Sequence, residues 1–277
     1  MADVVVMMHA AVLLAAVFLV PSEVRQGRVI RVSGPATGQG FSVEFATKTF
    51  PLFVDGGAAQ TLVPVSVDQA PGKYDVVIRQ GKTELQRSAV TVRKTAFRTQ
   101  NIQATKQMKE LRPIPGEVER MQALATTVSP VRFFEDAFVA PVSGCQNSPF
   151  GVQRLHNGKP TGAYHRGVDQ RGAKGTPIKA AASGMVVVAQ PDFQVRGGTV
   201  GIDHGHGLTS HYLHMSRVTA REGQRVKQGE VIGYVGSTGF ATAAHLHWGT
   251  YVHGTPIDPN EFAALRPCAA PQRKKGK

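Results

Sequence analysis

The chain has 277 residues, a formal net charge of +13 and a pI near 10.1. Its 42% hydrophobic content, 30 glycines and 17 prolines suit a β-rich globular protein with many turns and exclude a disordered or coiled-coil chain. Because one hydrophobic core typically serves about 100–150 residues, two domains are expected. The positive charge predicts attraction to polyanions, but no recognition motif or interleaving of aromatic and basic residues supports nucleic-acid binding.

An apolar run, Val4–Val20, opens the chain and ends at Pro21. Its length fits a signal peptide or a short membrane anchor, so residues 1–22 are expected to direct export to the cell envelope. No Lys or Arg precedes the run, and a first strand of a soluble domain is the alternative interpretation.

Short runs rich in Val, Phe and Thr fill residues 23–102, separated by turn signals such as Gly56-Gly57 and Pro71-Gly72. Evenly spaced short strands predict an antiparallel β-sandwich of the immunoglobulin-like kind. This segment contains no cluster of His, Cys, Asp or Glu, so no chemistry is assigned to it.

A more polar segment, residues 103–137, reads as a linker with a short helix, in which Val118, Met121 and Leu124 line one face and pack against a domain. Strand patterns return over residues 138–265 and predict an antiparallel β-sheet domain. Residues 266–277 read as a basic tail. The expected fold is therefore mainly β, with a sandwich, a short helical linker and a second sheet domain.

Nine of the ten histidines lie between His156 and His253. His245 and His247 belong to the apolar run HLHWGTYV, which reads as a strand, where residues two apart point to the same face. Two imidazoles side by side on one face indicate a metal site. The pair in His204-Gly205-His206 is flanked by glycines and reads instead as a solvated loop.

A second element of the metal site is the segment YHRGVDQRG, whose glycines favour an extended or looped backbone with His165 and Asp169 on one side. Together with one imidazole from the later strand, they leave a fourth tetrahedral position for water, as a catalytic zinc requires. No HExxH motif and no Glu in these segments supplies a general base. A histidine is therefore expected in that role, with His214 and the spare His245 as candidates.

The order and spacing of these residues resemble the lysostaphin-like and LytM-like zinc metallopeptidases, which hydrolyse peptide bonds in peptidoglycan. The resemblance runs from FVAPVSG through HRGVDQRGAKGTP and GLTSHYLHMS to AAHLHWGTY and PIDP. It implies that His165, Asp169 and His247 hold one Zn²⁺ and that His214 and His245 are the catalytic pair. The segment before the linker resembles, more loosely, the immunoglobulin-like domain of some exported relatives.

The resemblance implies a zinc metalloendopeptidase that cuts peptidoglycan stem peptides or cross-bridges on the periplasmic or cell-wall side of the envelope. The alternative is a non-catalytic peptidoglycan-binding or amidase-activating protein of the same fold. Relatives carry a tyrosine near the site, which Tyr164 or Tyr212 could supply. Cys145 and Cys268 bracket the segment, and in an exported chain they are expected to form a disulfide.

Overall fold

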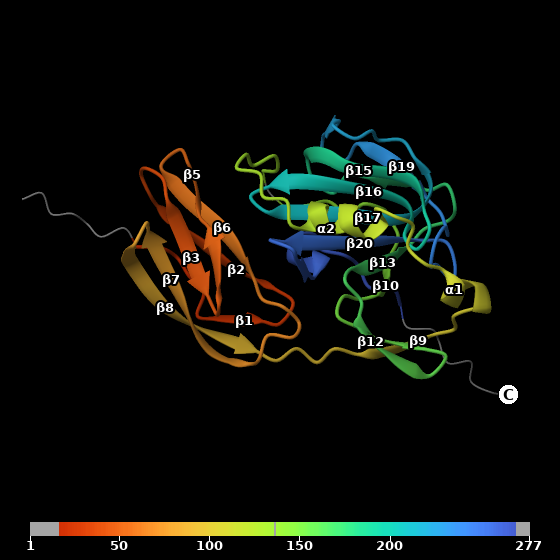
Figure 1. The fold of residues 1–277 in the computed structure, drawn as a ribbon, viewed down its shortest axis with the longest axis horizontal. Coiled ribbons are helices and arrows are strands. Elements are labelled where there is room, and N and C mark those ends of the chain that lie inside the picture. Colours follow the sequence, from red (N-terminus) through yellow and green to blue (C-terminus); the bar gives the residue numbers. More distant parts are fainter. Residues whose placement is uncertain (1–16, 136, 270–277) are drawn as a thin grey trace, which may run out of the picture.

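The computed structural model describes residues 17–135 and 137–269, which form two β domains joined by a linker that carries helices α1 and α2 (Figure 1). The expectation of a mainly β fold is confirmed. The expected export segment lies outside the described residues as far as residue 16, as does the basic tail from residue 270. Among the described residues, no helix is long and apolar enough to cross a membrane.

The N-terminal domain is a sandwich of a five-stranded sheet, ordered β1-β8-β7-β3-β4, and a three-stranded sheet, ordered β2-β6-β5. Its strands are β1 (Glu23–Arg25), β2 (Val29–Pro35), β3 (Phe41–Phe45), β4 (Lys48–Pro51), β5 (Phe53–Asp55), β6 (Ala58–Pro64), β7 (Gly72–Gln80) and β8 (Thr83–Arg93). Apolar side chains of both sheets share one core, to which β3 contributes alternate residues. Two sheets are present as expected, but β1 pairs in parallel with β8, so the sandwich is not wholly antiparallel. The immunoglobulin likeness is not confirmed.

This domain begins within the segment that the sequence assigns to export. The side chain of Phe18 is 2% exposed and belongs to the sandwich core. Its backbone is fixed by Gln86, whose side-chain oxygen accepts from the Phe18 N–H at 2.8 Å. Phe18 is therefore part of the first domain, although the sequence places it in the export segment.

The C-terminal domain is built on a ten-stranded sheet in which every pairing is antiparallel, as predicted. Its strands are β10 (Gln146–Ser148), β13 (Val168–Arg171), β14 (Pro177–Lys179), β15 (Gly184–Phe193), β16 (Gly197–Gly205), β17 (Leu208–Val218), β18 (Arg225–Val226), β19 (Val231–Val235), β20 (His245–Val252) and β21 (Thr255–Ile257), followed by the 3₁₀ helix η1 (Pro259–Glu261). Trp248 and Tyr212 are the largest fully buried side chains of its core.

The linker is integrated into the C-terminal domain. Just before it, strand β9 (Thr99–Ile102), at the end of the segment predicted as the first domain, pairs in parallel with β11 (Gln153–His156), which also pairs with β12 (Lys159–Tyr164). Helix α1 (Lys106–Glu110) follows, and α2 (Glu117–Ala125) packs across β15, β16 and β17. Of the three residues predicted to face a domain, Met121 and Leu124 are buried, but Val118 is 45% exposed.

Contacts between the two domains are both charged and aromatic. Arg28, the residue before β2, pairs with Asp258 and Glu261 at 3.4 and 3.3 Å. Phe53 of β5 stacks on the ring of His206, with centroids 4.0 Å apart. The two domains therefore share an extended interface.

The expected disulfide is confirmed, because Cys145 and Cys268 are bonded across a sequence separation of 123 residues. It joins the segment before β10 to the segment after η1. Backbone hydrogen bonds reinforce the same junction, from Gln146 N–H to the Arg266 carbonyl and from Cys268 N–H to the Gln146 carbonyl. The bond thus closes the C-terminal domain at its two ends.

Candidate metal centre

Strand register brings the first two predicted ligands together. Strands β13 and β20 are antiparallel, and Asp169 lies directly opposite His247. Residues opposite each other in such a pair project their side chains to the same face of the sheet. The sequence predicted this strand and its face from the HLHWGTYV pattern.

The third ligand comes from the turn that precedes β13. His165 follows β12, and its backbone N–H donates to the Val152 carbonyl. Gly167 lets this turn approach β20, since a Cβ there would lie 2.5 Å from the Trp248 carbonyl oxygen and 2.8 Å from His247 Nε2. Any larger residue would push the His165 turn away from β20.

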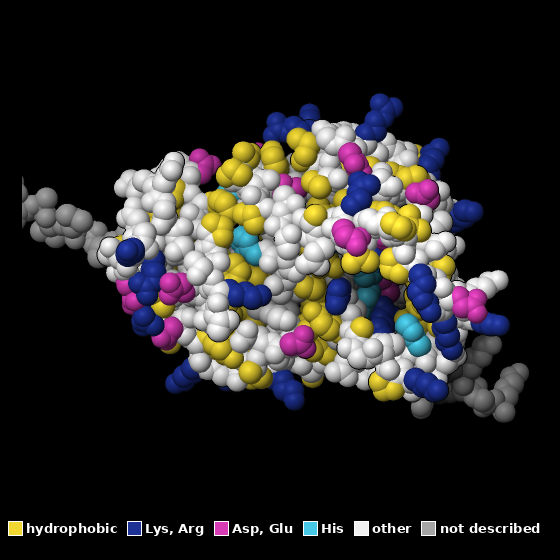
Figure 2. All heavy atoms as spheres, in the orientation of Figure 1, with side chains coloured by type: hydrophobic (Ala, Val, Ile, Leu, Met, Phe, Trp, Pro, Cys, Tyr) yellow, Lys and Arg dark blue, Asp and Glu magenta, His cyan; other side chains and the backbone are white. Residues whose placement is uncertain are grey.

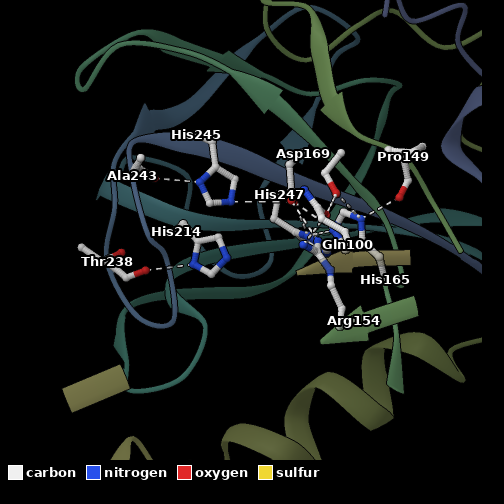
Figure 3. A network of polar contacts seen from close by, with 11 residues as sticks. Gln100, Pro149, Arg154, His165, Asp169, His214, Thr238, Ala243, His245 and His247 are labelled. Atoms are coloured by element: carbon white, nitrogen blue, oxygen red, sulfur yellow. Dashed lines mark hydrogen bonds and ion pairs between the residues drawn. The ribbon is translucent and has the colours of Figure 1, made fainter. Parts of the chain in front are cut away.

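Three ligand atoms converge in this arrangement. His165 Nε2 lies 2.9 Å from Asp169 Oδ1 and 3.0 Å from His247 Nδ1, and His247 Nδ1 lies 3.0 Å from Asp169 Oδ1 (Figure 3). A tetrahedral zinc with bonds of about 2.0–2.1 Å separates its ligands by about 3.3 Å, so the triangle matches one ion. Two imidazole nitrogens and one carboxylate oxygen are also the ligands that zinc prefers. The group could therefore hold a metal ion.

Neighbouring groups orient the ligands. The Pro149 carbonyl lies 2.9 Å from His165 Nδ1 and can only accept, so this nitrogen carries the hydrogen and leaves Nε2 free for a metal. Arg154 donates to Asp169 Oδ2 at 3.1 Å, leaving Oδ1 as the ligand oxygen, and donates to Gln100 Oε1 at 2.7 Å. Such outer contacts fix ligand geometry in metal sites.

The predicted catalytic pair stands beside the three ligands. His214 Nδ1 donates to the Thr238 carbonyl at 2.9 Å, and His245 Nδ1 donates to the Ala243 carbonyl at 2.8 Å (Figure 3). The two rings are 5.0 Å apart, and His245 Nε2 lies 3.7 Å from Asp169 Oδ1. In the neutral form of each ring, Nδ1 therefore carries the hydrogen and Nε2 is the acceptor.

Burial and mutual charge set the protonation of the group. Burial alone would raise the pKa of Asp169, but His165 and His247 outweigh it and hold this pKa well below its ordinary value. Burial lowers the pKa of His247 to about 4. Burial, together with the nearby His245 and His247, lowers the pKa of His214 to about 3. At neutral pH, Asp169 is ionised and the His214 and His247 rings are neutral.

A cavity of about 480 Å³ opens over the centre and includes all five predicted site residues in its lining. Figure 2 shows histidine side chains in a hollow on the C-terminal half of the visible face. Gln100 and Ile102 of β9 and Met108 of α1 form part of the wall, and Arg154 forms another part. Sequence reasoning missed these four residues.

The two candidate tyrosines differ in position. Tyr164 lines the cavity, and burial raises its pKa. Tyr212 is fully buried, and its hydroxyl oxygen accepts from Ala181 N–H at 2.9 Å and lies 3.0 Å from Ser210 Oγ. Of these two tyrosines, Tyr164 lines the cavity and Tyr212 does not.

The expectation that His204-Gly205-His206 forms a solvated loop was wrong. His204 is 0% exposed, with Nδ1 donating to the Ser183 carbonyl at 2.8 Å and Nε2 accepting from Ser210 at 2.7 Å. His206 is 7% exposed under Phe53 of the other domain. The glycines mark a turn correctly, but the linker and the N-terminal domain cover it. Neither histidine belongs to the metal centre.

Comparisons with known proteins agree with this geometry. The model of Peptidase family M23 matches residues 163–259. The DD-carboxypeptidase/endopeptidase Mpg of Neisseria meningitidis is 38% identical over 125 residues, which are 44% of this chain and 27% of the relative. The peptidoglycan DD-endopeptidase ShyA of Vibrio cholerae is 36% identical over 129 residues, which are 47% of this chain and 29% of the relative. The chain thus covers less than a third of the length of these curated relatives.

A solved structure from Pseudomonas aeruginosa, named as a candidate peptidase M23, covers a larger part of the chain. It matches 81% of this chain and 88% of its own length, with a TM-score of 0.60 and 27% identity. The match therefore extends beyond residues 163–259. On these grounds, the chain carries a peptidase family M23 domain.

Proposed function

We propose that the chain is a zinc-dependent endopeptidase that hydrolyses peptide bonds in peptidoglycan stem peptides or cross-bridges. One observation carries the proposal: three ligand atoms within 3.0 Å of one another lie in a cavity that also holds two further histidine rings. Relatives that are 36 to 39% identical to this chain over their matched residues are named as peptidoglycan endopeptidases, which supports the choice of substrate.

His165, Asp169 and His247 would hold the zinc, which supplies a Lewis acid that lowers the pKa of water and polarises a scissile carbonyl. His214 and His245 would move the proton from the attacking water to the leaving amine, and a ring that carries this proton on Nε2 would donate a hydrogen bond to the developing oxyanion. Their Nδ1 hydrogens are held by backbone carbonyls, so each ring offers Nε2 to the reacting groups. Burial lowers the pKa of His214 to about 3, so the ring is neutral at neutral pH and its Nε2 carries a free lone pair.

The direct test is the release of new amine groups from purified peptidoglycan by the full chain. Release is expected with zinc, is expected to stop with a chelator, and is expected to return when zinc is added back. Mass analysis of the released muropeptides identifies the bond that is cut. Zinc-loaded, folded protein that releases no amines would refute the endopeptidase proposal.

A non-catalytic peptidoglycan-binding or amidase-activating role is the alternative outcome of the same experiment. Such a protein would sediment with peptidoglycan without releasing amines, or would raise amine release only when an amidase is added. The full set of ligands and the adjacent His214 and His245 favour the catalytic role.

We also propose that the chain is exported to the cell envelope, where peptidoglycan lies. The Cys145–Cys268 disulfide supports this location, because disulfides form and persist in oxidising compartments. A signal peptide or anchor belongs to the same proposal, but it would end before Phe18, because this residue packs in the core of the first domain. N-terminal sequencing of the envelope protein tests it.

A further inference from the structure

Glu117, the first residue of α2, is a fully buried carboxylate, 0% exposed. Its oxygens accept from the backbone N–H groups of Gln194, Val195 and Arg196 at 3.0, 3.2 and 3.0 Å, and from the Arg196 guanidinium at 3.0 Å. Burial alone would raise the pKa of Glu117, but these donors outweigh it and lower the pKa. A buried charge is tolerated only when it is paired in this way. The linker helix is thus tied to one short loop, residues 194–196.

The 194–196 loop connects β15 to β16 and reaches the catalytic histidines. The Arg196 carbonyl accepts from the backbone N–H of His214 at 3.0 Å. The Val195 carbonyl accepts from Phe240 N–H at 2.8 Å, in the segment that contains Thr238. Thr238, in turn, accepts from the His214 ring. The loop that Glu117 holds therefore supports both the backbone and the ring contact of His214.

His214 needs this support because its backbone is unusual. Its φ is 65°, in the left-handed region that non-glycine residues rarely adopt. The pairing of β16 with β17 shifts register here, from Val200 opposite Tyr212 to Gly198 opposite Met215. A bulge of this kind re-aims a side chain, and strained backbone persists only where neighbours fix it.

Helix α2 is itself held in place on the sheet. Leu124 is fully buried, and a Cβ at Gly201 of β16 would lie 2.1 Å from Leu124 Cδ2. A side chain at position 201 would collide with Leu124, so glycine allows α2 to pack closely against β15 and β16 in one position. Glu117 is therefore presented to the 194–196 loop from a rigid element.

We propose that Glu117 is a positioning residue: through the 194–196 loop, it holds His214 in the strained conformation that aims the ring at the metal centre. The inference rests on the proposed function, in which His214 moves a proton. It makes the linker helix a functional part of the peptidase domain, although α2 lies outside residues 163–259.

Glu222 offers a matched control. Its carboxylate also joins α2 to β15, because it accepts from Ala189 N–H at 2.9 Å and pairs with Arg120 of α2. Its side chain is 42% exposed, and it makes no contact with residues 194–196 or with the cavity lining. Glu222→Gln therefore weakens a contact between α2 and β15 but leaves the contacts between Glu117 and residues 194–196 unchanged.

The experiment compares Glu117→Gln with Glu222→Gln in the full chain. Glu117→Gln should leave the zinc content unchanged. It should lower kcat by about 100-fold and change KM little, because a displaced His214 ring slows the chemical step and not substrate binding. Glu222→Gln should retain the kcat of the unmodified chain. Thermal unfolding shows that each variant is folded.

A second readout does not depend on turnover. In protein labelled with ¹⁵N-histidine, the NMR signals of the His214 ring are identified because they are missing from the His214→Asn variant. These signals should shift or broaden in Glu117→Gln and should be unchanged in Glu222→Gln. Should Glu117→Gln fail to fold, Glu117→Asp keeps the charge but withdraws it by one methylene, and a smaller change in the same signals and in kcat is expected.

Unchanged kcat and unchanged His214 signals in a folded Glu117 variant would overturn the inference. If the unmodified chain releases no amines, the proposed function fails, but the ring signals still decide whether Glu117 positions His214. The two failures are therefore distinguishable.

Discussion

His247 and Asp169 are 78 residues apart in the chain, yet His247 Nδ1 and Asp169 Oδ1 lie 3.0 Å apart. They are opposite partners in the pairing of β13 with β20, so the hydrogen-bonded sheet sets their separation. A site built on strands holds its ligands more rigidly than one built on loops. Two of the three ligands are thus fixed by the core of the domain before any ion binds.

The roles of the two histidines on β20 are separable. We expect His247→Ala to lose bound zinc and peptidoglycan hydrolysis together, because it removes one of three ligands. His245→Ala should keep zinc and lower kcat by about 10²–10⁴-fold, the usual contribution of a general acid or base. Metal analysis of the purified variants and amine release check both results. Wall-lytic activity at the level of the unmodified chain in both variants would contradict the assignment.

Arg154 is expected to tune the metal site through Asp169. Arg154→Met removes the donor to Asp169 Oδ2 and should weaken zinc binding by about 10–100-fold, the usual effect of losing an outer contact to a ligand. Titration against a competing chromophoric chelator measures the affinity. Arg217→Met is the control, because Arg217 lies over the Tyr234 ring at 4.2 Å and does not line the cavity. Equal affinities in the two variants would argue against this role of Arg154.

Local patterns in the sequence marked all five residues as candidates, and the family resemblance divided them into three ligands and a catalytic pair. Alternation along HLHWGTYV places His245 and His247 on one face, and the strand β20 has that geometry. Register is not local, so the sequence alone did not show that Asp169 lies opposite His247.

The residues that were missed depend on contacts between distant segments. Gln100 meets Arg154 only because β9 pairs in parallel with β11, and neither residue belongs to a motif. The burial of His204 depends on coverage by other segments, which flanking glycines cannot reveal. Likewise, the polar sequence around Glu117 did not indicate a buried carboxylate, because its partners are main-chain N–H groups of the 194–196 loop.

Buried histidines should make the fold sensitive to acid. Burial lowers the pKa of His204 to about 4 from its ordinary value of 6.5. Between these values the unfolded chain binds a proton that the folded chain does not, so stability is full above pH 6.5 and falls as the pH drops toward 4. The slope is about 1.4 kcal/mol per pH unit for this one histidine.

Urea unfolding of the metal-free chain from about pH 7 to about pH 5 measures this slope. His204→Asn should be less stable at neutral pH, because it loses a buried hydrogen bond, but its stability should fall less steeply with acid. His211 and His253, whose pKa values burial lowers to about 3 and about 4, remain in both proteins and cancel in the comparison. Parallel curves for the two proteins would contradict the assignment to His204.

The disulfide should stabilise the peptidase domain without taking part in the chemistry. Because it closes a loop across a sequence separation of 123 residues, replacing both cysteines by serine should lower the free energy of unfolding by about 2–4 kcal/mol, chiefly by freeing the unfolded chain. Neither cysteine lines the cavity, and the backbone hydrogen bonds around Gln146 remain, so zinc affinity should change little. Urea unfolding with and without reductant, together with the chelator titration, checks both statements. An unchanged free energy of unfolding in the double variant would show that the disulfide does not stabilise the domain. Two free thiols in protein taken from the envelope would show that the disulfide does not form there.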